Sequence, residues 1–155
     1  MLTAVLISSF AQVPAIFLAA SYSDRHGRRG IYKMGALAMA VWGFCVFPLM
    51  DTGSLLAITL ALTVGQIFIG MMYGPQAALL TELFSTEVRY SGASLGYQLG
   101  AIVGGGMAPI AATALIAAFG SAIWVSAYIA LASLLTWLSL HLLGENHQAD
   151  LEKVA

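Results

Sequence analysis

Long apolar stretches alternate with short polar breaks along the whole of this 155-residue chain. Five of the stretches have the roughly 20 mostly apolar residues that an α-helix needs to cross a bilayer. They cover residues 2–21, 31–50, 54–83, 92–119 and 122–143, and a polar tail follows at 144–155. The pattern predicts an all-α membrane protein in which residues 1–143 form a bundle of five transmembrane helices.

The composition favours a membrane protein over a soluble one. The chain is 60% hydrophobic and only 8% charged, with a mean hydropathy of +0.89, whereas a soluble domain is usually about a quarter charged. Charged residues fall in or beside the polar breaks, and no basic run suggests a nucleic-acid partner. The single cysteine, Cys45, allows no intrachain disulfide and no zinc or redox motif. We therefore expect no metal and no cofactor, and the partners to be the lipid bilayer and small molecules.

The break at residues 23–29 gives the expected orientation. It holds three of the six basic residues, namely Arg25, Arg28 and Arg29. Lys and Arg are retained on the cytoplasmic side of a membrane, so this break sets the direction of its neighbouring helices. The breaks at 51–54 and 119–121 have no Lys or Arg, whereas the break at 85–89 and the tail do. We expect a multi-pass membrane protein with its N-terminus outside and its C-terminus in the cytoplasm.

The basic break also offers specific contacts. Asp24 lies at the end of the first helix, and Gly27 allows a sharp turn with positive φ. The arginines can pair with Asp24, with carboxylates of a neighbouring segment or with anionic lipid headgroups. Alternatively, the break is a plain basic loop that only sets topology.

A second charged pair, Glu82 and Arg89, flanks the break before the fourth stretch. A tight turn would join these two residues, or Glu82 would pair with the arginines of the first break. Such pairs are either a latch that holds helix ends closed or ordinary interfacial charge. The candidate gate residues are Asp24, Arg25, Gly27, Arg28, Arg29, Glu82 and Arg89.

Polar residues recur along one face of the third stretch, where Gln66 and Tyr73 follow a three-four spacing. A glutamine that faces lipid is costly, so Gln66 is expected to face protein or a water-filled cavity. These side chains either bind a small polar substrate near the midplane or form hydrogen bonds between helices. The substrate-pathway candidates are Gln12, Gln66, Tyr73, Gln76, Tyr97 and Gln98.

The fourth stretch has glycines four residues apart, at Gly92, Gly96, Gly100 and Gly104. Such a ridge lets another helix backbone approach closely. The run from Gly104 to Gly106, followed by Pro109, predicts a bend in this helix.

No Asp, Glu, Lys, Arg or His lies at mid-membrane depth in the five stretches. The residues needed for acid-base or nucleophilic chemistry inside the membrane are therefore missing, and we expect no enzyme. A carboxylate that couples transport to protons would have to come from elsewhere.

Residues 23–29, SDRHGRR, resemble the cytoplasmic loop motif of the major facilitator superfamily. Residues 82–92 are similar to the loop before helix eleven of those transporters, and most of all to the metabolite:proton symporters. The resemblance covers helices eight to twelve of a twelve-helix fold. There are two departures from the usual motifs, since Ala20 replaces a glycine and Ser85 a proline.

This resemblance implies proton-coupled symport of a small polar metabolite, an organic acid or a zwitterion, by alternating access. It also implies a missing N-terminal half as a partner, and an odd number of helices fits the later part of a longer protein. Two alternatives stay open: a truncated remnant or assembly module that does not transport, and an efflux antiporter of the same superfamily.

Overall fold

The structure is a computed structural model that describes residues 2–143, so the predicted tail at 144–155 lies outside the described residues. The elements are α1 (Leu2–His26), α2 (Arg28–Asp51), α3 (Leu55–Glu82), α4 (Arg89–Ala101), the π-helical segment η1 (Ile102–Met107), α5 (Ala108–Phe119) and α6 (Ile123–Leu142). Since α4, η1 and α5 form one span, five helices in residues 2–143 are long and apolar enough to cross a membrane. The predicted all-α membrane class is confirmed.

The first polar break is mostly helical. α1 runs on to His26, five residues past the end expected from hydropathy, and α2 begins two residues later at Arg28. Gly27 alone separates the two helices, with φ of +93° and its N–H donating to the carbonyl of Ser23 at 3.0 Å. Glycine adopts such a left-handed conformation without steric cost, which lets the chain reverse in one residue. Asp24 and Arg28 therefore lie on facing helix ends.

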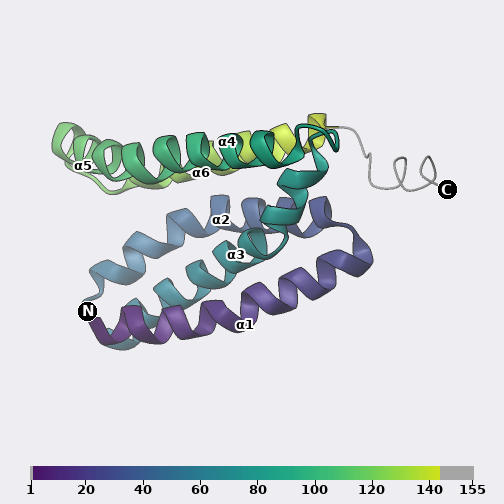
Figure 1. The fold of residues 1–155 in the computed structure, drawn as a ribbon. Helices are drawn as coiled ribbons and strands as arrows, with labels where there is room; N and C mark the ends of the chain where they lie inside the picture. The colour runs from purple at the N-terminus through teal and green to yellow at the C-terminus, as the bar shows by residue number, and fades with distance from the viewer. Residues whose placement is uncertain (1, 144–155) are drawn as a thin grey trace.

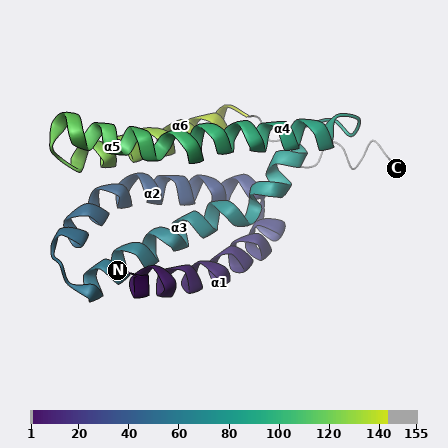
Figure 2. The same cartoon turned by 60° about the vertical axis from the view of Figure 1, so that its left-hand side comes forward.

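Helices α1, α2 and α3 pack against one another, and α6 packs on α2 (Figure 1). The α1–α2 turn, the α3–α4 turn and the end of α6 all lie at the same end of the bundle, which is on the right in Figure 1. We call this end, with residues 23–33, 82–89 and 143, the basic end. Figure 2 shows the same arrangement from a second direction.

Small residues make up most of the buried core. Ala4, Ala36 and Ala61 are completely buried, whereas large side chains such as Phe10 and Leu56 are mostly exposed. This distribution is the reverse of a soluble core and is typical of membrane helices, in which small residues allow close approach and large ones face lipid.

The closest helix contact joins α1 and α3 through glycines of α3. A Cβ atom at Gly74 would lie 2.7 Å from the carbonyl oxygen of Ile16, and one at Gly70 would lie 2.9 Å from the Cβ of Ala15. Close packing through small residues therefore occurs on α3. The sequence analysis expected such packing on the fourth stretch and described α3 by its polar residues.

The span from α4 to α5 is the least covered part of the bundle. None of residues 89–119, all of which are described, is buried. The ring of Phe84 fills the space beside Gly92, and Leu80 reaches Gly96. No atom of residues 2–143 lies within 4 Å of the place where a Cβ would stand at Gly100 or Gly104. Half of the glycine ridge is therefore open within the described chain.

At the position of the expected bend, the helix widens into the π-helical segment η1, which contains Gly104, Gly105 and Gly106. Pro109 lies in the first turn of α5, directly after η1. α4 and α5 continue in nearly the same direction in both views (Figures 1 and 2). π-Helical turns are rare and are frequent at functional sites.

Candidate functional site

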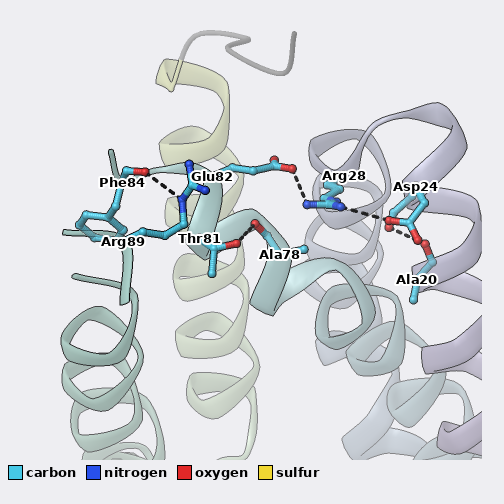
Figure 3. Close-up of polar contacts among 9 residues, drawn as sticks. Ala20, Asp24, Arg28, Ala78, Thr81, Glu82, Phe84 and Arg89 are labelled. Atoms are coloured by element: carbon cyan, nitrogen blue, oxygen red, sulfur yellow. Dashed lines mark hydrogen bonds and ion pairs between the residues drawn. The ribbon is translucent and has the colours of Figure 1, made fainter. Parts of the chain in front are cut away.

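Arg28 joins three helices at the basic end. Its side chain leaves the first turn of α2 and donates through Nη1 to the carboxylate of Glu82, the last residue of α3 (Figure 3). Its Nη2 lies 3.3 Å from Oδ1 of Asp24, near the end of α1. One guanidinium therefore bridges two carboxylates from two other helices, a contact that the planar fork of arginine makes possible.

Burial makes the Glu82 contact the stronger of the two. The side chain of Arg28 is 24% exposed and that of Glu82 35%, whereas Asp24 is 63% exposed. Fully exposed ion pairs contribute about 0–1 kcal/mol because water screens them, and this screening weakens as the pair is shielded. The Nε atom of Arg28 is buried and has no hydrogen-bond partner within the described residues. The partly desolvated cation therefore depends on its carboxylates.

Arg29 extends the network to the last helix. Its Nη1 donates to the backbone carbonyl of Leu143, directly after α6. A cation at this place compensates the free carbonyls and the negative end of the helix dipole. With Arg28, it connects the ends of α1, α2, α3 and α6.

Arg89 has a local role. Its Nε donates to the carbonyl of Phe84 at 3.4 Å, within the turn between α3 and α4 (Figure 3). Of the two pairings that the sequence left open for Glu82, the structure therefore has the one with Arg28.

Arg25 is exposed and makes no ion pair or hydrogen bond with any of residues 2–143. Gly27 supplies the turn that places these groups.

Two of the substrate-pathway candidates come together between α3 and α4. The hydroxyl oxygens of Tyr73 and Tyr97 lie 3.1 Å apart. Tyr73 directly precedes Gly74 and Pro75, so the pair lies where α3 carries an internal proline. The two hydroxyls form a polar link between α3 and α4.

The four glutamine candidates are dispersed. Gln12 on α1 and Gln66 and Gln76 on α3 are half-buried, whereas Gln98 on α4 is exposed. Among residues 2–143, none of these side chains has a hydrogen-bond partner, so their amides are available to water or a ligand.

Sequence reasoning missed the Leu143 carbonyl as a partner of Arg29. A backbone acceptor has no residue-type signal, and only the packing of α6 on α2 reveals it. It also did not identify the acceptor of Trp42, whose Nε1 donates to the carbonyl of Ala61 at 3.1 Å and ties α2 to α3. A tryptophan deep in a transmembrane segment is the available signal for such a contact.

Comparison with known proteins gives a consistent assignment. The family model of the Major Facilitator Superfamily matches residues 1–153. A Haemophilus influenzae protein named for metabolite transport is 38% identical over 97% of the chain. The Escherichia coli inner membrane metabolite transport protein YhjE is 34% identical over 97%, and the Klebsiella pneumoniae citrate-proton symporter is 36% identical over 72%. No solved structure matches the chain detectably.

The chain is much shorter than these relatives. It covers 34% of the Haemophilus protein, 34% of YhjE and 25% of the citrate-proton symporter. It therefore spans about a third or less of the length of the curated relatives it matches.

Proposed function

Because the chain belongs to the major facilitator superfamily, we propose that it is part of a transporter that carries a small polar metabolite together with protons. The observation that carries the proposal is the charged cluster that connects four helix ends at the basic end. The Klebsiella relative is named a citrate-proton symporter, which supports proton coupling and an organic acid as the substrate class. The name of YhjE supports the bacterial inner membrane as the location.

In this proposal the cluster is an inner gate. Arg28 and Arg29 hold the ends of α1, α3 and α6 against α2 as long as their ion pair and hydrogen bond persist. Alternating access requires such contacts to break and re-form at a modest cost, because a ligand can shift an equilibrium only by its differential affinity for the two states. A partly shielded pair is strong enough to bias the equilibrium and weak enough to open.

The substrate route lies along α3 and α4. Tyr73 and Tyr97 offer two hydroxyls within one hydrogen-bond length of each other, and Gln66, Gln76 and Gln98 offer free amides on the same helices. Transporters bind substrates near the midplane on interrupted helices, and α3 carries Pro75 in this region. Neutral donors and acceptors of this kind suit a polar metabolite, with Gln12 contributing from α1.

The basic end faces the cytoplasm in this proposal, with the N-terminus of α1 outside. The arginines and Lys33 gather at the basic end, and the opposite turns at 51–54 and 120–122 have no basic residue. Retention of positive charge then fixes the direction of all five spans.

The test is uptake by proteoliposomes under an imposed pH gradient, acid outside. The chain alone and the longest open reading frame that contains it are compared, with labelled citrate, shikimate, proline and betaine as substrates. The proposal expects saturable uptake by the longer protein that stops when a protonophore collapses the gradient. Uptake that is indifferent to the gradient, or absent for every substrate, contradicts it.

One observation favours the alternative of a remnant or assembly module for the isolated chain. Residues 89–119 have no buried position, so a bundle of these five spans leaves most of this helix surface uncovered. The remaining N-terminal half of the transporter is the partner proposed for this face. Robust saturable uptake by the chain alone would contradict the alternative that the chain is a remnant that does not transport.

A further inference from the structure

An apolar groove of about 720 Å³ runs along α1, where this helix lies beside α2 and α3. Its lining comes from three helices, with Pro14 and Leu18 on α1, Ile67 and Met71 on α3, and Ile31 on α2. The surface that these residues offer is almost entirely hydrocarbon. Neither the charged cluster nor the tyrosine pair takes part in this groove.

The polarity of the groove changes along its length. The part lined by Ala11 to Ala19 is apolar. Tyr22, Arg25 and His26 line the other part, at the basic end, which we call the mouth of the groove. Fifteen residues of helix separate Ala11 from His26, which is about 22 Å at 1.5 Å per residue. Half of a bilayer's hydrocarbon core is about 15 Å thick. The groove thus matches one acyl chain plus a headgroup in length.

The mouth is positively charged and preformed. The rings of Tyr22 and His26 stack with centroids 4.2 Å apart, which fixes one side of the mouth. Arg28, Arg29 and Arg89 have protein acceptors, but Arg25 has none among residues 2–143. A guanidinium without a carboxylate partner at a membrane surface is suited to a phosphate, which it can bind through two parallel hydrogen bonds.

We propose that this groove binds a phospholipid with an anionic headgroup from the leaflet at the basic end. The headgroup phosphate lies against Arg25, beside the Tyr22–His26 stack, and an acyl chain lies between Leu18 of α1 and Met71 of α3. The proposal requires that the chain spans a bilayer. It does not depend on the orientation, the substrate or proton coupling, so it can fail or hold independently of the proposed transport.

Quenching by brominated lipids tests the proposal in the folded chain. Leu18, which is 71% exposed, becomes the only tryptophan through Leu18→Trp with Trp42→Phe, Trp124→Phe and Trp137→Phe. The protein is reconstituted with phosphatidylglycerol or phosphatidylcholine, each brominated in its acyl chains. We expect phosphatidylglycerol to bind about fivefold more tightly at the groove, which is the effect of one basic residue at an anionic membrane surface.

Arg25→Gln should remove this preference, whereas Arg25→Lys should keep part of it. Lys33→Gln is the matched control, because it removes a charge from the basic end without lining the groove, and it should leave the preference unchanged. Equal quenching by both lipids would overturn the proposal. So would protection from both lipids, which would mean that a protein segment covers the groove.

Native mass spectrometry of the chain with its natural tryptophans provides a second measurement. The unaltered chain should retain phosphatidylglycerol at higher collision energy than Arg25→Gln, and Lys33→Gln should behave like the unaltered chain. Equal retention by the unaltered chain and Arg25→Gln would contradict the proposal even if the tryptophan variant did not fold.

Discussion

Arg28 owes its role to its position at the start of a helix directly after a glycine. Gly27, with φ of +93°, turns the chain so sharply that Arg28 contacts Asp24, four positions earlier in the chain. The guanidinium is then far enough into the bundle to reach Glu82, 54 positions later in the chain. A lysine at this position has one point charge and cannot hold both carboxylates with the same geometry.

Glu82→Gln should destabilise the folded chain by about 1–2 kcal/mol, more than an exposed pair and less than a fully buried one. The substitution keeps the shape of the side chain but leaves Arg28, which is largely shielded, without its main counter-charge. Titration with sodium dodecyl sulfate in mixed micelles, followed by circular dichroism, measures the loss.

Glu87→Gln is the matched control, since Glu87 is exposed and has no contact with a basic residue in 2–143. This variant should unfold at the same detergent fraction as the unaltered chain. Equal effects of the two substitutions would show that net charge, and not the Arg28 contact, matters at this end.

Gly74→Ala should cost about 1–3 kcal/mol, because its methyl group would overlap backbone atoms of Ile16 and Ala20 that cannot move independently. Gly100→Ala is the counterpart in open space, where alanine favours the helix by about 0.5–1 kcal/mol. The same detergent titration measures the change in stability of each variant. A neutral Gly74→Ala would mean that α1 and α3 are not in close contact.

At the scale of elements, hydropathy was sufficient to predict the number of spans but not their ends. α1 extends past Ser21 into the polar break, because Ser23 to His26 continue the helical hydrogen bonding until Gly27 ends it. The charges therefore lie on helix ends instead of in a loop. This difference determines which carboxylate Arg28 can reach.

The π-helical segment η1 divides the fourth span into α4 and α5. Replacing Gly105 and Gly106 by alanine should favour a regular α-helix by about 1 kcal/mol per residue. If the segment rearranges during transport, the initial uptake rate should fall severalfold while membrane insertion is unchanged.

Uptake measured in the proteoliposomes described above checks this prediction. If the alanine variant transports at the normal rate, η1 is only a local irregularity of the helix.

At the scale of the whole molecule, the sequence predicted the class, the five spans and the family, since these follow from hydropathy and from motifs at 23–29 and 82–92. It could not decide the partner of Glu82. Both a local pair with Arg89 and a pair with the arginines of the first break stayed open, and the turn after α3 directs Arg89 to the Phe84 carbonyl. Contacts between distant helix ends depend on packing, which no local pattern encodes.

The proposed topology makes a separate prediction. In a Cys45→Ala background, a cysteine at Ser85 should react with a membrane-impermeant maleimide only from the cytoplasmic side, and one at Thr52 only from outside. Cys45 has to be replaced because it is exposed. Labelling of position 52 from the cytoplasm would reverse the whole assignment.

The most direct test of the gate is a charge exchange between Arg28 and Glu82, with uptake by the longer reading frame as the measurement. Arg28→Glu and Glu82→Arg should each lower the initial rate about tenfold or more, because each places like charges together at the basic end. The double variant restores opposite charges and should recover a large part of the rate, with Asp24 limiting full recovery. Single variants that transport normally, or a double variant no better than either single one, would contradict a gate built on this pair.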